Sequence, residues 1–195
     1  MCSWCYGFSP EFSKVINDLD EGIQLEIVMG GLRPYNQEKM TDLKSFLTEH
    51  WEEVHERSGQ EFQYGILDDS SIAYDTEPSC RAVAVMLDIA PEHGWSYFQN
   101  VQKAFYYDNK NPQDPKTFID LASKVEGIDA SEFERKFTSQ QYKDRVKEHF
   151  QMARNLGVSS FPTVVLKNGE SYNLIAQGYA ETDQVQSQIA KALSQ

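Results

Sequence analysis

Two cysteines separated by two residues have the clearest chemical potential in this sequence. They form the run Cys2-Ser3-Trp4-Cys5 at the start of the chain. On the first turn of a helix, residues i and i+3 lie on one face, so their sulfurs can form one disulfide. The helix dipole and the free backbone N–H groups at that position favour a thiolate at the first cysteine. The spacing therefore predicts thiol–disulfide exchange, in which Cys2 attacks and Cys5 resolves the mixed disulfide.

Other uses of such a cysteine pair fit this sequence less well. A c-type haem site needs a histidine directly after the second cysteine, where Tyr6 stands. A structural zinc site needs two more ligands, but there is no second cysteine pair, and His50 and His55 are five residues apart. Zinc binding and inert thiols stay as alternatives to redox chemistry, and no metal is expected.

A second motif, Ser160-Phe161-Pro162-Thr163, opens an apolar and β-branched stretch. Proline at the first residue of a strand gives up no ladder hydrogen bond. If the bond before Pro162 is cis, as a minority of such bonds are, the backbone of Phe161 turns towards the sulfurs and offers its polar groups to an extended substrate. Ser3, Trp4, Phe161 and Pro162 are therefore the candidate substrate-binding residues. Packing over the disulfide is an equal alternative for Trp4.

Three further side chains carry two interpretations each. Cys80, in an apolar helical stretch, is most simply a small buried hydrophobic residue; the alternative is a secondary thiol near the active-site cleft. Arg33 and Arg81 could attract a carboxylate of glutathione or of another substrate, although an ordinary surface arginine is the simpler interpretation. None of the four histidines is expected to be catalytic.

Helical and strand patterns alternate at the two ends of the chain. Apolar residues with a helical period predict a helix over 9–20, capped by Ser9. Alternation of apolar and polar residues predicts a strand over 23–29. After Gly157, β-branched residues, the Asn168-Gly169 turn signal and an apolar four-residue repeat predict a β-hairpin followed by a helix. The two ends therefore indicate an α/β domain.

The middle of the chain is helical. Helical stretches that end at proline or glycine cover roughly 41–58, 77–89, 95–108, 115–125, 130–137 and 139–156. Segment 60–76 has no clear period and is predicted to be a loop. This order predicts a discontinuous α/β domain, residues 1–34 with 157–195, and an inserted all-helical subdomain over 35–156.

These features together resemble the DsbA-like branch of the thioredoxin superfamily, which includes kappa-class glutathione transferases and 2-hydroxychromene-2-carboxylate isomerases. The resemblance rests on CSWC opening a helix, on GVSSFPTVVL with its hairpin, on the helical block between them, and on GGLRP at 30–34 and DTEPSCRAV at 75–83. The last two runs resemble the cytosolic members in particular. The resemblance implies a thioredoxin-like fold with a helical insertion, Cys2 as an exposed nucleophile, Cys5 as a buried resolving thiol and a cis-proline at Pro162.

Two features depart from the family pattern. DsbA carries Pro-His between its cysteines, whereas Ser3-Trp4 here supplies no charge, so we predict a less acidic Cys2 and a less oxidising disulfide. In this fold a strand runs directly into the CxxC motif, but only Met1 precedes Cys2. The first strand is therefore expected to be missing from this chain, whose sequence begins late, at an internal methionine.

The function predicted from the sequence is that of a DsbA-like protein disulfide oxidoreductase. Isomerase and transferase relatives usually keep a serine where Cys2 stands and lack the second cysteine, so the presence of both favours disulfide exchange. A glutathione-dependent isomerase or transferase on the same scaffold, and a redox-sensing adaptor, stay as alternatives. We expect no cofactor beyond the redox-active disulfide, glutathione as a candidate co-substrate, and protein or small-molecule thiols and disulfides as partners.

Composition narrows the remaining function classes. The 195 residues include 18 Lys plus Arg and 30 Asp plus Glu, a net charge of −12, which argues against nucleic acid as a partner. No stretch approaches the roughly 18 consecutive apolar residues of a membrane helix, and no secretory signal is evident, so a cytoplasmic protein is expected. Three cysteines do not make a disulfide scaffold, while 40% hydrophobic residues suffice for a packed core.

Overall fold

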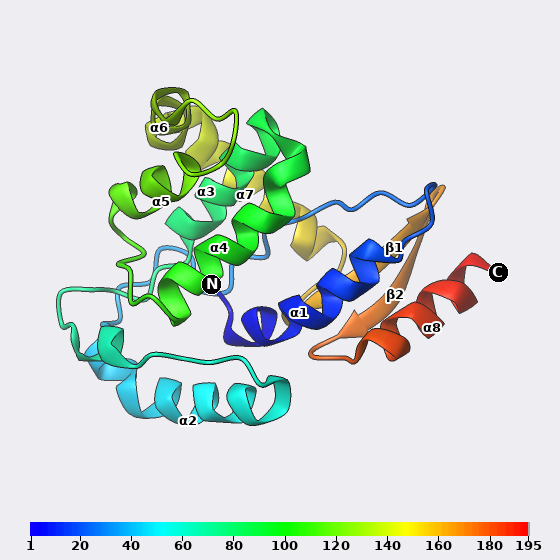
Figure 1. The fold of residues 1–195 in the computed structure, drawn as a ribbon, viewed down its shortest axis with the longest axis horizontal. Helices are drawn as coiled ribbons and strands as arrows, with labels where there is room; N and C mark the ends of the chain where they lie inside the picture. The colour runs from blue at the N-terminus through cyan, green and yellow to red at the C-terminus, as the bar shows by residue number, and fades with distance from the viewer. Residues whose placement is uncertain (195) are drawn as a thin grey trace.

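The computed structural model describes residues 1–194. The elements in chain order are α1 (Ser3–Asn17), α2 (Met40–Ser58), η1 (Gly65–Asp68), α3 (Glu77–Ile89), η2 (Pro91–His93), α4 (Gly94–Tyr106), α5 (Pro115–Ala122), α6 (Ala130–Thr138), α7 (Gln140–Asn155), β1 (Thr163–Asn168), β2 (Ser171–Gln177) and α8 (Thr182–Leu193). Figure 1 shows the hairpin and α8 at one end, the bundle of α3 to α7 at the other, and α1 running from the middle of the molecule alongside the hairpin. The fold is thioredoxin-like with a helical insertion.

The hairpin forms the entire sheet of the described chain, and its two strands are antiparallel. Asn168 pairs with Ser171, so the turn residues are Gly169 and Glu170, one position later than the Asn-Gly signal predicts. Gly169 has a φ of 60°, a conformation that favours glycine. One cluster of buried side chains joins the hairpin to α1 and α8: Phe8, Val15, Ile175, Val185 and Ala192.

The strand predicted over 23–29 does not form. The segment has no regular secondary structure, and no ladder joins it to another strand within residues 1–194. Burial does not alternate along it: Leu25 is exposed, and Met29 is its one buried residue. A strand needs a hydrogen-bonded neighbour for its backbone groups, and the alternating pattern supplies only suitable side chains. Within the same described residues, no strand precedes α1.

Helix α1 begins earlier than a cap at Ser9 predicts and continues through Pro10. Proline has no N–H to donate to the carbonyl four residues before it. That carbonyl belongs to Tyr6, and it accepts hydrogen bonds from Ser9 Oγ and from Gln60 Nε2 instead, each at 3.0 Å. These two side-chain donors replace the missing backbone bond, so the CxxC motif and the rest of the helix form one element.

The predicted helices of the middle region are all present, close to their predicted bounds. Helix α3 is central to them, because it packs against α4, α5, α6 and α7. The shared core is mostly aliphatic on α3 and mostly aromatic on the helices around it. Its larger members include Val83, Val85, Met86, Tyr97, Phe118, Phe133, Phe137 and Phe150. None of the helices in the described chain has the length and hydrophobicity that a membrane crossing requires.

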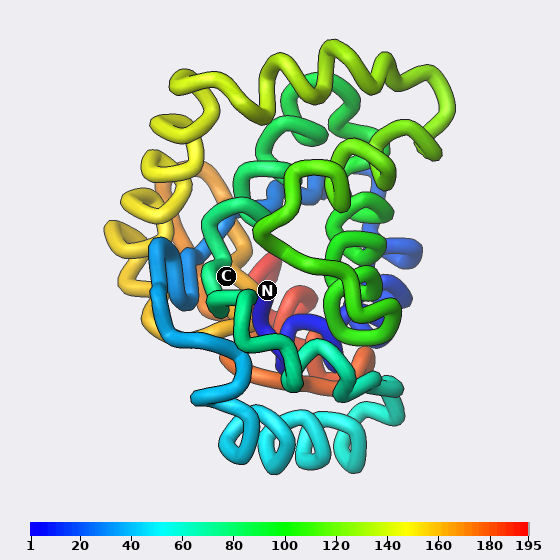
Figure 2. The backbone as a smooth tube through the Cα atoms, turned by 90° about the vertical axis from the view of Figure 1, so that its left-hand side faces the viewer, coloured from blue at the N-terminus to red at the C-terminus, as the bar shows by residue number. Residues whose placement is uncertain are grey.

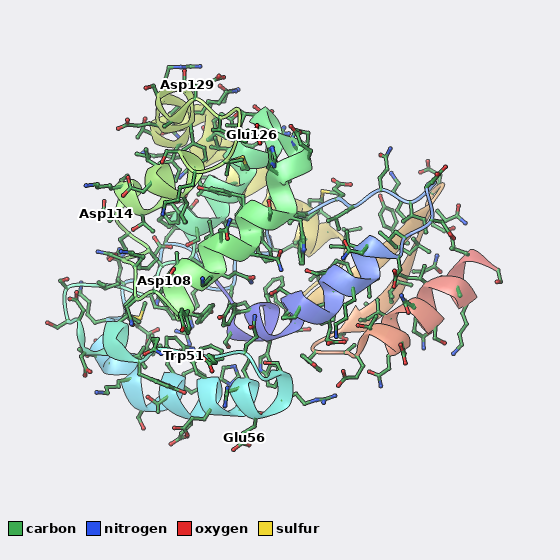
Figure 3. All side chains as sticks on the ribbon, in the orientation of Figure 1. Trp51, Glu56, Asp108, Asp114, Glu126 and Asp129 are labelled. Atoms are coloured by element: carbon green, nitrogen blue, oxygen red, sulfur yellow. The ribbon has the colours of Figure 1, made fainter. Side chains whose placement is uncertain are left out.

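Helix α2 and segment 60–76 form a second core with the end of α4. Trp51 on α2 is fully buried, and Figure 3 shows it on the inner side of the helix, whereas Glu56 points away from the molecule. The prediction of a loop over 60–76 is only partly right, since the segment contains η1 and buries six apolar side chains: Phe62, Ile66, Leu67, Ile72, Ala73 and Tyr74. Without regular repeats, these residues are recognisable as core only in the folded chain.

The CxxC motif lies where these parts meet. Tyr6, directly after Cys5, belongs to the core of α2 and segment 60–76. Figure 2 shows the N-terminus between α2 (cyan) and the helices of the α3–α7 bundle (green to yellow). The predicted division into residues 1–34 with 157–195 and residues 35–156 stays a prediction.

Candidate active site

Cys2 and Cys5 lie at the N-terminal end of α1. Cys2 is the N-cap residue with extended backbone, and its carbonyl accepts the Tyr6 N–H at 3.0 Å. No acidic residue occupies the first turn, so nothing there opposes the positive end of the helix dipole. Both cysteines are half-buried free thiols, so the structure describes the dithiol form.

The two thiols differ in acidity. A hydrogen bond from the Cys5 thiol lowers the pKa of Cys2 to about 7, against an opposing contribution from burial. The same hydrogen bond, together with burial, raises the pKa of Cys5 well above its ordinary value. The pKa of Cys2 is higher than the value of about 3.5 typical of DsbA, which is the direction that the uncharged Ser3-Trp4 pair predicts. At neutral pH a Cys2 thiolate therefore coexists with a protonated Cys5.

Phe161 and Pro162 lie beside Cys2, although 159 residues separate Cys2 and Phe161 in sequence. The Cys2 thiol donates to the Phe161 carbonyl oxygen, with 3.6 Å between sulfur and oxygen. The Phe161–Pro162 peptide bond is cis, as the resemblance implies. Pro162 is buried, and its carbonyl accepts the Gly178 N–H at 2.8 Å. The tertiary structure thus joins the two motifs that the sequence singled out.

Trp4 is half-buried among rings from two other elements. Its indole meets His50 of α2 edge to face, with ring centroids 5.9 Å apart, and Tyr179 at 6.4 Å. His50 in turn stacks on Phe46, which is 55% exposed. The sequence did not identify His50 or Phe46 as neighbours of the motif, and only their spacing of four residues on one helix face hints at it. Ser3, a predicted substrate-binding residue, is buried and presents little surface.

Two buried tyrosines also lie near the cysteines. The hydroxyl groups of Tyr74 and Tyr106 approach to 3.4 Å. Burial raises the pKa of both phenols, and the nearby Cys2 and Cys5 raise it further. Sequence analysis did not find this pair, because the two residues lie 32 positions apart with no motif around them.

Cys80 lies in the first turns of α3 and is buried. Burial raises the pKa of its thiol, whereas a hydrogen bond from the Gly31 backbone lowers it. Cys80 is close enough to Cys5 for its charge to raise the pKa of Cys5. Cys80 is thus a buried small residue near the CxxC pair, and its role as a secondary thiol stays a prediction.

The runs at 30–34 and 75–83 are hydrogen-bonded to each other. The Arg33 N–H donates to Thr76 Oγ1 and the Thr76 N–H donates to the Arg33 carbonyl, both at 3.1 Å. The Tyr35 N–H donates to the Asp75 carboxylate at 2.7 Å. The Arg33 side chain pairs with exposed Glu38 at 2.7 Å, which fits a surface arginine.

Arg81 is not the surface arginine that the sequence suggested. It is 9% exposed, and its guanidinium bonds Glu77 at 2.8 Å and the Phe137 carbonyl at 2.6 Å. Because α3 is covered on most sides, an arginine in its first turns has to be paired internally. No three metal-binding side chains come together within the part of the chain that the structure describes.

Comparison with known proteins finds similarity to thioredoxin-like proteins over nearly the whole chain. A family model described as thioredoxin matches residues 1–187. A candidate protein disulfide isomerase from Nitrosomonas europaea is 30% identical, with a TM-score of 0.91 over all of this chain and 93% of that chain. The cytosolic disulfide reductase DsbM from Pseudomonas aeruginosa is 20% identical, with a TM-score of 0.80 over 100% and 95% of the two chains.

Two further structures agree in fold. The structure of DsbM with glutathione is 19% identical, with a TM-score of 0.78 over 100% of this chain and 96% of that chain. A candidate DsbA oxidoreductase from Streptomyces coelicolor is 16% identical, with a TM-score of 0.75 over 100% of this chain and 86% of that chain. No curated protein sequence matches this chain. On the family model, which matches residues 1–187, and the 30% identical relative, the chain belongs to the thioredoxin family.

Proposed function

We propose that this protein exchanges thiols and disulfides through Cys2 and Cys5, with Cys2 as the nucleophile and Cys5 as the resolving thiol. The observation that carries the proposal is the placement of Cys2 at the N-cap of α1, one turn before Cys5 and beside the Phe161 carbonyl that precedes Pro162. The opposed shifts of the two thiol pKa values support the same roles. The thiolate is the attacking species in disulfide exchange, and an attacking thiol works best with a pKa near the ambient pH. A pKa of about 7 suits Cys2 for that step.

The exchange proceeds in two displacements. The Cys2 thiolate attacks a substrate disulfide, a Cys2–substrate mixed disulfide forms, and one substrate thiolate leaves. Cys5 then loses its proton and attacks the Cys2 sulfur, which forms the Cys2–Cys5 disulfide and releases the second substrate thiolate. Two electrons pass from the protein dithiol to the substrate disulfide. The reverse sequence oxidises a substrate dithiol.

Substrate binding is assigned to the surface around Cys2. The Phe161 backbone lies beside the sulfur and Pro162 follows it, so an extended substrate segment can meet polar backbone groups there. Trp4 offers one edge of an aromatic surface that continues through His50 to exposed Phe46. Ser3 is left out of this surface, because the residue is buried.

Glutathione is the proposed small thiol partner. The solved complex of DsbM with glutathione supports this choice, since that reductase shares the fold of this chain. The cytosolic location of DsbM likewise supports a cytoplasmic location here. A glutathione-dependent transferase remains the second candidate, and it differs in predicting glutathione binding that survives the loss of Cys5.

The test is a redox titration. The protein is equilibrated across glutathione redox buffers, and free thiols are alkylated and counted by mass spectrometry at each poise. We expect a reversible two-thiol transition that maps to Cys2 and Cys5. A midpoint nearer about −270 mV indicates a reductase and one nearer about −120 mV an oxidase.

Two results would contradict the proposal. If no disulfide forms between Cys2 and Cys5 at any poise, the two-cysteine mechanism is wrong. If Cys2 instead accumulates a stable glutathione adduct, in the wild type and in Cys5→Ala alike, the transferase is favoured. Cys2→Ser serves as the control, because it cannot form either product at that position.

A further inference from the structure

The GGLRP run at 30–34 has no role in the exchange described above, yet its first glycine touches the loop that faces Cys2. A Cβ atom at Gly30 would lie 1.9 Å from Cε1 and 2.3 Å from Cζ of Phe161. Such contacts are far shorter than van der Waals distance. The Phe161 ring therefore lies directly against the Gly30 backbone, in the space that any side chain at position 30 would need.

The backbone at Gly30 is anchored on both sides. Met29 is buried in the core of the α3–α7 bundle. A Cβ at Gly31 would lie 2.7 Å from Cδ1 of Phe150, so Gly31 is packed against α7 in the same way. The Phe161 ring thus rests on a support that the helical bundle holds in place.

The position of Phe161 determines the position of its carbonyl oxygen relative to the Cys2 sulfur. Its carbonyl oxygen accepts the Cys2 thiol with 3.6 Å between oxygen and sulfur. A carbonyl that accepts from the neutral thiol favours the protonated form over the thiolate. At this length the contact is already long, so a displacement of Phe161 by about an ångström removes it.

We propose that Gly30 is a positioning residue for Cys2. Because Gly30 has no side chain, the Phe161 ring can pack directly on its backbone, and this packing holds the Phe161 carbonyl within hydrogen-bond distance of the Cys2 sulfur. The inference rests on the proposed function only in taking Cys2 as the nucleophile. The contact from Gly30 through Phe161 to Cys2 connects the helical bundle to the reacting atom. It also fixes the backbone that an extended substrate would meet.

The substitution Gly30→Ala tests the proposal. Gly30 is not among the glycines with positive φ, so alanine fits its backbone and the Phe161 ring is the group that has to move. The pKa of Cys2 is read from the pH dependence of iodoacetamide alkylation, with Cys2 resolved by mass spectrometry. We expect a fall of about 0.5 unit, roughly threefold in the ionisation constant, because the contact that favours the thiol is lost.

Two variants separate positioning from stability. In the Phe161→Ala background the ring is absent, so adding Gly30→Ala should produce no further change in the pKa of Cys2. Gly94→Ala is the matched control: Gly94 also lacks a positive φ, and its Cβ would lie 2.3 Å from Cδ2 of Leu87, so alanine there should lower the melting temperature and leave the pKa of Cys2 unchanged. If Gly30→Ala does not fold, Phe161→Leu removes the contacting ring atoms without adding bulk, and the same fall is expected.

The proposal is overturned if Gly30→Ala lowers the melting temperature but leaves the pKa of Cys2 unchanged, or if its effect persists in the Phe161→Ala background. Failure of the proposed function would be distinct. In that case the wild type forms no Cys2–Cys5 disulfide in redox buffers, whereas the alkylation readout still reports whether Gly30 acts on Cys2.

Discussion

Two helices of this protein have cysteines at their N-terminal ends, and the acidity of these thiols differs between the two helices. Cys2 is the N-cap of α1 and Cys5 lies in its first turn, whereas Cys80 lies one turn after the start of α3. Both ends present the positive pole of a helix dipole. Yet the pKa of Cys2 falls to about 7, whereas burial raises the pKa of Cys80.

Local surroundings explain the difference. The Cys5 thiol donates a hydrogen bond to Cys2, and the first turn of α1 contains no carboxylate. The first turn of α3 contains Glu77, whose charge raises the pKa of Cys80 after the larger effect of burial. A helix N-terminus alone therefore does not activate a thiol, because burial and a nearby carboxylate outweigh it at Cys80.

Replacement of Cys2 or Cys80 by serine should give the largest difference in activity between the two helices. In Cys2→Ser, dithiol-dependent reduction of insulin should fall more than about a hundredfold, because a serine hydroxyl does not ionise at neutral pH. Cys80→Ser should retain activity within about twofold. Undiminished activity of Cys2→Ser, or a loss in Cys80→Ser without a change in melting temperature, would reverse the assignment.

The second largest difference between Cys2 and Cys80 should be in the pH dependence of their alkylation. Deprotonation of Cys2 occurs as the pH rises through its pKa of about 7, so its rate should rise about tenfold between pH 6 and pH 8. Native Cys80 should stay unmodified over that range and react only after denaturation, because it is buried. Mass spectrometry of each thiol provides the measurement. A Cys2 profile centred near the ordinary thiol pKa, about 8.5, would contradict the lowered value.

Removal of the Cys5 thiol should bring the pKa of Cys2 closer to that of an ordinary thiol. In Cys5→Ala the pKa of Cys2 should rise towards about 8.5, because the hydrogen bond that favours its thiolate is lost. Its alkylation rate at pH 7 should then fall roughly threefold, since a more basic thiolate is also more nucleophilic. Cys5→Ser, whose hydroxyl still donates, should give a smaller rise. An unchanged profile in Cys5→Ala would mean that the helix end itself lowers the pKa.

The smallest effect concerns surface access. Trp4→Ala should raise KM for a protein disulfide about twofold without changing kcat, because it removes one aromatic contact beside Cys2. Tyr172, an exposed aromatic residue in the hairpin, provides the matched control, and Tyr172→Ala should leave KM unchanged. Equal effects of the two substitutions would show that Trp4 only covers the sulfurs.

Sequence patterns predicted the secondary structure correctly where it depends on residues close together in the chain. The helices of the bundle follow from apolar periodicity that ends at proline and glycine, and the structure confirms them. Segment 23–29 shows the limit of such patterns, because a strand depends on a neighbour that no local repeat can supply. Arg81 shows the same limit, since its burial depends on how α6 and α7 cover α3.

By itself the sequence determined which residues are candidates for chemistry in this protein: two thiols one helical turn apart, and a proline at the start of an apolar strand. Bonding and dipoles within one turn are enough to make those predictions. Only the tertiary structure decided which groups surround the sulfurs. The Phe161 carbonyl on Cys2, the His50 ring on Trp4 and the Gly30 seat under Phe161 join residues from distant parts of the chain. Such contacts depend on packing between elements, and packing is a property of the folded chain as a whole.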